Sequence, residues 1–147
     1  KSFMTNNFLI NKTVFDKIRF DENISKYGHE DTLFGFELKK ENIAIHHIDN
    51  PLEHIGLETS GRIIAKEKEG IDNLYSIILA HESANEITED ITLLRYYRLA
   101  KKLHITPVLA YAYRRFHNRI ERNLTGKKPS LLLFDLYKLG YLSSLEK

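Results

Sequence analysis

The sequence of 147 residues contains no cysteine, so it can form neither disulfide bonds nor a thiolate metal site. Nothing in the composition points to an oxidising compartment, and we expect a cytoplasmic protein. Long apolar runs are also absent, because runs such as Leu131 to Phe134 are far below the ~20 residues that a membrane-spanning helix needs. Hydrophobic residues still make up 42% of the chain, which is enough to build a core.

Charge is unevenly distributed along the chain. Residues 1–60 hold 7 Lys/Arg and 10 Asp/Glu, whereas residues 95–128 hold 10 and 1 respectively. The second block alternates arginines with aromatic residues. Such charges usually cover a solvated helix face, but their density also fits a phosphate-bearing partner, either nucleic acid or an anionic lipid surface. The two parts of the chain are therefore expected to have different roles.

The first sixty residues show a mixed α and β pattern. Residues 7–10 and the apolar run at 43–48 have the composition of short strands. Between them, residues 13–18 and 30–40 place apolar side chains at helical spacing, and Asn42 is a plausible stop for the second helix. A strand-and-helix arrangement is therefore predicted for this part of the chain.

Beyond Gly61 the apolar residues repeat at the period of α-helices. They form two stripes, made of Ile64, Ile71, Leu74, Tyr75 and Ile78, and of Ile87, Ile91, Leu94 and Tyr97. Thr106 and Pro107 are typical of the N-cap and first turn of a third helix. Ser130 is expected to start a last helix and Gly140 to end it. We therefore predict two units, residues 1–60 and an all-helical extension over residues 61–147.

Two adjacent carboxylates, Glu30 and Asp31, stand at the predicted start of the helix over residues 30–40. Acids in a first helical turn complement the positive end of the helix dipole, which stabilises the helix by ~0.3–1 kcal/mol and needs no further role. A carboxylate held there, close behind Gly28, is also well placed to act as a general base. The pair alone does not decide between the two interpretations.

Histidines are concentrated between residues 46 and 54. His46, His47 and His54 fall close to Asp49 and Glu53, and imidazole with carboxylate is a credible ligand set for Zn, Mn or Fe. No standard ligand spacing is matched, however, and on a strand His46 and His47 would point to opposite faces. His54 lies in a loop bracketed by proline and glycine, which makes it the better ligand candidate.

The segments from Thr5 to His54 occur in an order that resembles the second half of the catalytic domain of family 2 glycosyltransferases of the GT-A type. The pieces are "TNNFLI", "NKTVFDKI", "RFDENI", the Glu-Asp pair, "TLFGFELKKENI", "AIHHID" and a loop ending in histidine. They cover about a third of the chain. The resemblance implies the C-terminal, acceptor-side part of an α/β GT-A fold in residues 1–60.

That resemblance also implies roles for individual residues. Asp31 stands in the place of the base that deprotonates the acceptor hydroxyl as it attacks a nucleotide-sugar with inversion. Glu30 matches the acid that hydrogen-bonds the acceptor, and Asn6 and Asn7 match a strand on the acceptor side. His29 replaces a more frequent glycine, so we expect it to narrow or polarise the acceptor site.

For cofactors and partners, the resemblance implies a divalent metal, Mn or Mg, with His54 as a ligand. It also implies a nucleotide-sugar donor and a carbohydrate or lipid-linked acceptor. The sequence contains no Asp-x-Asp pair and begins at Lys1 instead of a methionine. We therefore expect a fragment that lacks the nucleotide-binding half and is inactive alone. Its basic helices are expected to hold it at the inner face of a membrane. As the partner of these helices, an anionic membrane is expected in preference to nucleic acid.

Two alternatives remain open from the residues themselves. One is a non-enzymatic helical module that uses residues 95–128 to bind nucleic acid or an anionic membrane surface, with Glu30 and Asp31 serving only the helix start. The other is a small independent metallohydrolase built around His46, His47 and His54.

Overall fold

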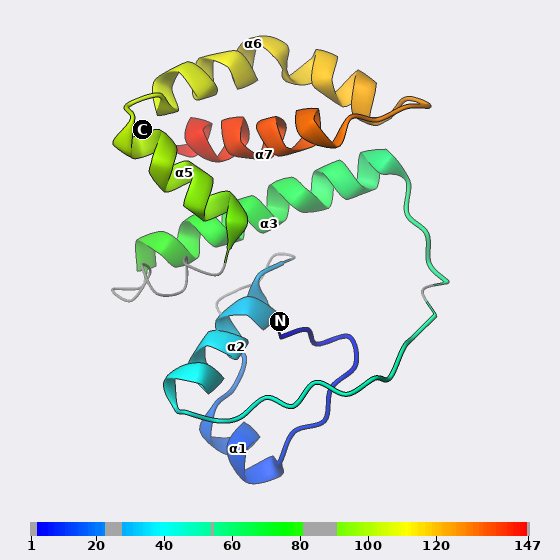
Figure 1. Cartoon of the computed structure of the whole chain (residues 1–147), viewed down its shortest axis with the longest axis vertical. Coiled ribbons are helices and arrows are strands. Elements are labelled where there is room, and N and C mark those ends of the chain that lie inside the picture. Colours follow the sequence, from blue (N-terminus) through cyan, green and yellow to red (C-terminus); the bar gives the residue numbers. More distant parts are fainter. Residues whose placement is uncertain (1–2, 23–27, 54, 81–90, 147) are drawn as a thin grey trace.

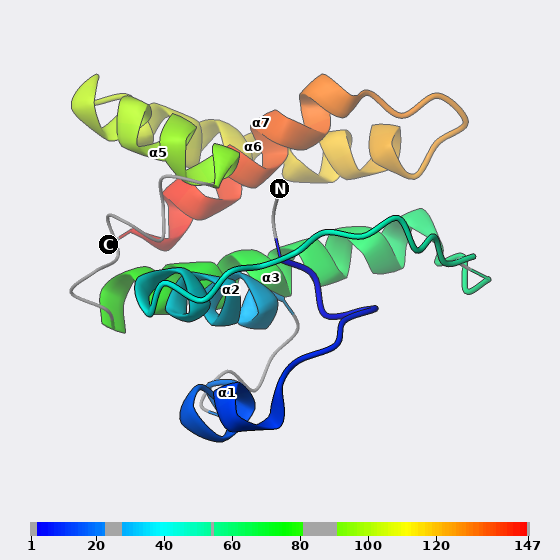
Figure 2. The ribbon, with the colours of Figure 1, turned by 60° about the horizontal axis from the view of Figure 1, so that its bottom comes forward.

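The computed structural model describes residues 3–22, 28–53, 55–80 and 91–146, and all regular structure within these ranges is helical (Figure 1). The helices are α1 (Lys12–Lys17), α2 (Glu30–Lys40), α3 (Ser60–Ala80), α5 (Thr92–Lys102), α6 (Thr106–Leu124) and α7 (Leu131–Leu145). Helix α3 lies between α7 on one side and α2 on the other, and α1 lies beyond α2 (Figures 1 and 2). The helices α5, α6 and α7 pack together above α3.

The prediction of an α/β GT-A fold is wrong for the described residues, because they contain no strand. Residues 7–10 and 43–48, which the sequence pattern predicts as strands, form neither helix nor strand, and the side chains of Leu9 and Ile48 are 99% and 79% exposed. A strand is stabilised by hydrogen bonds to a neighbouring strand. The sequence pattern indicates a local preference, but the part of the chain that the structure describes contains no neighbouring strand.

Several helix boundaries agree with their sequence signals. Helix α2 spans the residues that the sequence predicts, and Asn42 follows it with a positive φ of 55°. Asn11 caps α1 by accepting a hydrogen bond from the backbone N–H of Thr13 at 2.9 Å. Ser130 caps α7 in the same way, accepting from the N–H of Leu133 at 3.3 Å. Short polar side chains satisfy first-turn N–H groups that would otherwise lack a partner.

Two predicted boundary residues have other roles. Thr106 is the first helical residue of α6, and the N-cap position is held by Ile105 without a side-chain hydrogen bond. Gly140 does not end the last helix, because α7 continues to Leu145. A Cβ atom at Gly140 would lie 3.0 Å from Cβ of Tyr113 and 3.3 Å from the carbonyl oxygen of Leu109. Glycine is needed there for the close approach of α6 and α7.

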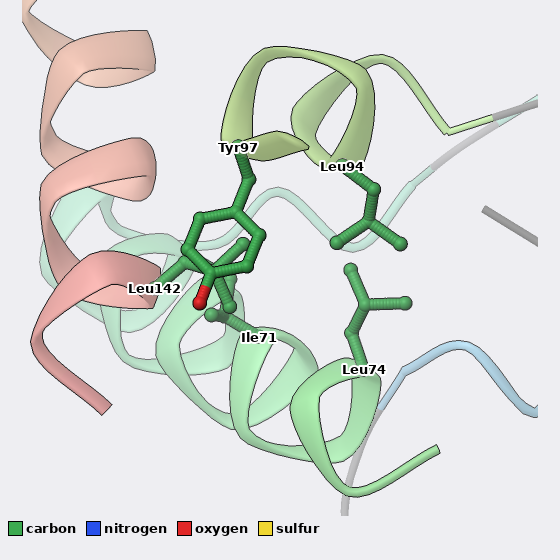
Figure 3. Packing of buried hydrophobic residues seen from close by; sticks show 5 residues of the cluster. All are labelled: Ile71, Leu74, Leu94, Tyr97 and Leu142. Atoms are coloured by element: carbon green, nitrogen blue, oxygen red, sulfur yellow. The ribbon is translucent and has the colours of Figure 1, made fainter. Parts of the chain in front are cut away.

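The main core joins α3, α5 and α7 through five buried side chains that point toward one another (Figure 3). These are Ile71, Leu74, Leu94, Tyr97 and Leu142. A second cluster of Ile64, Leu124 and Tyr137 joins α3, α6 and α7. Most of these positions lie on the predicted apolar stripes. One stripe member, Ile87, lies outside the described residues.

Three tyrosines in or beside these clusters each donate a hydrogen bond to a carboxylate on another part of the fold. Tyr141 bonds Asp72 at 2.8 Å, Tyr97 bonds Glu146 at 3.0 Å, and Tyr137 bonds Glu121. Burial raises the pKa of each of these phenols, and the acceptor carboxylate adds to the rise. The hydroxyls therefore stay protonated as donors, which satisfies polar groups in the core.

Helix α2 has a separate contact on each of two faces. Phe34 and Leu38 pack with Ile18 in a cluster rich in phenylalanine, in which Phe34 stacks on Phe20 with 4.3 Å between ring centroids. The preceding residue, Leu33, packs instead against Ile77 of α3. Helix α2 thus links the N-terminal cluster to the helical bundle, so the direction of its first turn depends on both contacts.

No helix in the described ranges combines the length and the apolar character that a membrane span needs. The division into units at residue 60 stays a prediction.

The main core predicts a large effect for Leu142, which is 0% exposed. Leu142→Ala should lower the free energy of unfolding by about 2–5 kcal/mol, because it removes buried methyl groups and leaves a cavity. The matched change on the same helix, Leu132→Ala, removes a side chain that is 70% exposed and should stay within about 0.5 kcal/mol of wild type. Urea denaturation measures both, and equal losses would contradict the assigned core.

Candidate functional site

An open pocket of about 420 Å³ lies at the start of α2. Three separate parts of the chain line it: residues 4–6, residues 28–32 and one face of α3 that carries Lys66, Glu67 and Gly70. The lining therefore combines the N-terminal segment, the first turn of α2 and the middle of α3. These parts are far apart in sequence, and they come together because Leu33 packs on Ile77 of α3 and Phe3 packs on Phe34.

The backbone at Gly28 determines how closely the start of α2 approaches α3. Gly28 has a φ of +100°, and a Cβ atom added to it would lie 3.0 Å from Cα of Gly70. Both the positive φ and the space exclude larger side chains. The amide of Asn73 on α3 donates a hydrogen bond to the carbonyl oxygen of Gly28 at 3.1 Å. Gly28 is thus held against α3 directly before the candidate site residues.

His29 is the N-cap residue of α2 and has a left-handed backbone with φ of 68°, which is uncommon for residues other than glycine, although histidine adopts it more often than most. Such a conformation costs roughly 1 kcal/mol. Burial lowers the pKa of the imidazole, and the nearby carboxylates of Asp31, Glu67 and Glu30 oppose that shift only in part. The fold therefore favours a neutral His29 in the pocket wall.

Glu30 and Asp31 occupy the first turn of α2, where the helix dipole stabilises negative charge. An oxygen of Asp31, Oδ1, accepts a weak hydrogen bond from the hydroxyl of Thr32 at 3.4 Å. Among the described residues, Oε2 of Glu30 is buried and has no hydrogen-bond partner. A buried carboxylate oxygen without a donor is costly, so a ligand hydroxyl that donates to it would be favoured.

Four of the six predicted site residues line this pocket together: Asn6, His29, Glu30 and Asp31. Asn7 does not, because its side chain is directed to the carbonyl oxygen of Asn50, to which it donates at 3.3 Å. His54 lies outside the described residues.

The described residues do not provide a metal site. No three His, Cys, Asp or Glu side chains in the ranges that the structure covers are grouped closely enough to hold an ion. His46 and His47 are exposed in the irregular segment after α2. The divalent metal that the resemblance implies therefore receives no ligand set here, and His54 as a ligand stays a prediction.

Sequence reasoning missed the contribution of α3. Glu67 and Gly70 line the pocket, as does Lys66, whose ammonium donates to Glu58 at 2.6 Å. The apolar stripe of α3 shows which face is buried, but it does not show which part of the chain covers that face. Glycine at position 70, inside a long helix, is the one sequence signal that could have indicated a close backbone approach.

The charges around the pocket determine which ligands suit it. The lining includes three carboxylates, those of Glu30, Asp31 and Glu67, and one ammonium, that of Lys66, which is paired with Glu58. An acidic lining repels phosphate groups and accepts hydrogen bonds from hydroxyls. The pocket therefore fits a polyhydroxylated ligand better than a nucleotide.

No protein-family model matches the chain, and no similar curated protein or solved structure was found.

The half-buried position of His29 predicts an unusual titration. Its imidazole should titrate below 6.5, because burial outweighs the attraction of the neighbouring carboxylates. Folding then favours the neutral ring, so the free energy of unfolding should rise with pH in the range just below 6.5 and level off above it. Two-dimensional NMR of the histidine rings measures the midpoint, with His29→Gln identifying the signal. A midpoint at or above 6.5 would contradict the dominance of burial.

Proposed function

We propose that residues 1–60 supply the acceptor site and the general base of an inverting glycosyltransferase that uses a nucleotide-sugar donor. The observation that carries the proposal is the shared pocket: Asn6, His29, Glu30 and Asp31, to which the resemblance assigns the acceptor side, line one cavity. The proposal concerns the chemistry of this site. It does not include the α/β sheet, which the described residues lack.

Asp31 has the environment that a base requires. Its carboxylate lines the pocket, is only partly buried, and stands in the first turn of α2, which fixes its direction. In the proposed reaction it removes the proton from an acceptor hydroxyl as the hydroxyl oxygen attacks the anomeric carbon of the donor and the nucleoside diphosphate departs. The proton ends on Asp31, and the configuration at that carbon inverts.

Glu30 and His29 position the acceptor in this proposal. The unpaired Oε2 of Glu30 accepts a hydrogen bond from a second hydroxyl of the acceptor sugar, which directs the reacting hydroxyl toward Asp31. The neutral imidazole of His29 contributes to the pocket wall without adding positive charge. Both residues follow the Gly28 turn, so packing on α3 holds them in place.

The donor is bound outside this pocket in the proposal, because an acidic lining does not hold a diphosphate. The nucleotide-binding part is therefore a separate part of the enzyme. Because the described residues present no metal ligand set, no step of the proposed reaction is assigned to an ion.

Replacing the proposed base should reduce catalysis strongly. In the native enzyme that contains these residues, Asp31→Asn should lower kcat for sugar transfer by about 10²–10⁴-fold, since the amide cannot take the proton. Release of nucleoside diphosphate, followed with a panel of nucleotide-sugars and glycan acceptors, measures the rate.

The matched control is Asp49→Asn, which removes an equal charge at an exposed position outside the pocket lining. It should leave kcat within about twofold of wild type, as is usual for surface changes. Wild-type transfer by Asp31→Asn would contradict the assignment of the base.

Glu30→Gln separates acceptor binding from proton transfer. The amide keeps the shape of the side chain but loses charge-assisted acceptance of a hydroxyl, so KM for the acceptor should rise by roughly tenfold. The KM for the donor should stay unchanged. An equal rise in both values would indicate a general disturbance of the fold instead of an acceptor contact.

A further inference from the structure

A second surface, on α5 and α6 and therefore away from the α2–α3 pocket, exposes apolar side chains in a continuous series. On α5 these residues are three or four positions apart, and the series continues through the turn into α6. The members are Tyr96, Leu99, Leu103, Ile105, Val108 and Tyr111, which we call the α5–α6 surface. Val108 and Tyr111 are 65% and 67% exposed. Isolated exposed apolar residues are common and need no explanation, whereas apolar residues gathered on one face are a candidate interaction surface.

The opposite sides of the two helices account for the packing of the bundle. Leu94, Tyr97 and Ala100 are the buried residues of α5, and Ala110 and Leu124 are those of α6. The α5–α6 surface is therefore not needed for the core within the described chain.

Basic side chains flank this apolar series. Residues 92–120 contain seven Lys/Arg and no Asp/Glu. Arg95 and Lys102 are exposed on α5, and Arg115 and Arg119 continue the stripe of Val108 and Tyr111 along α6. Arg114 is exposed beside them. The surface thus combines exposed aliphatic and aromatic groups with charged side chains that are all positive.

We propose that the α5–α6 surface binds the anionic face of a lipid bilayer. Lys and Arg meet anionic headgroups, tyrosines suit the interface, and aliphatic side chains enter the outer acyl region. In this proposal the protein lies on the membrane by this surface.

Other partners fit the same residues less well. Nucleic acid would engage the arginines and stack on tyrosines, but Leu103, Ile105 and Val108 would have no apolar partner in a phosphate-rich surface. A second copy of the chain would bring two surfaces of the same positive sign together, which is unfavourable. A bilayer is the partner that complements both the charge and the aliphatic groups.

The test is flotation of the protein with vesicles of phosphatidylcholine, with and without phosphatidylglycerol. We expect binding only to the anionic vesicles, weakening at high salt as surface electrostatics are screened. Each removed cation should lower the partition coefficient by about fivefold. The double variant Arg115→Gln/Arg119→Gln should therefore lower it by roughly thirtyfold. The double variant Leu103→Ser/Val108→Ser should lose at least about tenfold, because it removes the inserted groups.

Matched variants elsewhere control for charge and apolarity. Lys12→Gln/Lys40→Gln removes two exposed cations from α1 and α2, and Leu57→Ser removes an aliphatic side chain that is 89% exposed. Both should bind vesicles within about twofold of wild type. Urea denaturation confirms that each variant keeps the wild-type free energy of unfolding.

Three results would overturn the proposal. The first is equal binding to neutral and anionic vesicles, or equal losses in the surface and control variants. The second is binding to RNA or duplex DNA, without vesicle binding, that Arg115→Gln/Arg119→Gln weakens and Leu103→Ser/Val108→Ser does not. The third is a dimer in light scattering that Leu103→Ser/Val108→Ser dissociates, again without vesicle binding.

Discussion

The close backbone contact between Gly28 and Gly70 is the constraint on which the candidate site depends. A side chain at position 28 would lie 3.0 Å from Cα of Gly70 and would also have to adopt a φ of +100°. Because both backbones approach so closely, the first turn of α2 is directed across α3. His29, Glu30 and Asp31 then share a pocket with side chains of α3 that are more than thirty residues away in sequence.

Helix α2 transmits this constraint to the rest of the molecule. Its adjacent residues Leu33 and Phe34 pack in different clusters, one against Ile77 of α3 and the other in the N-terminal group of phenylalanines. The two carboxylates of the site therefore do not rest on a loop. They belong to a helix held from two sides, which is the rigidity that a positioned base requires.

Local features were predictable from the sequence, whereas long-range ones were not. The helix over residues 30–40 and the cap at Ser130 follow from nearby residues, and both agree with the structure. The predicted strands at 7–10 and 43–48 fail because a strand needs a partner that a local pattern cannot reveal. The predicted helix end at Gly140 fails for the same reason, because only its neighbour across the helix pair, Tyr113, explains why glycine stands there.

The site follows the same division. The positions of Glu30 and Asp31 in a first helical turn were evident from sequence, but the contribution of α3 was not.

The most direct test of the account is an NMR measurement of contact between the Hα protons of Gly28 and Gly70. We predict a nuclear Overhauser cross-peak in the wild-type chain that disappears in Gly28→Val. Absence of that cross-peak from the folded wild-type protein would contradict the packing of α2 on α3 from which the site was derived.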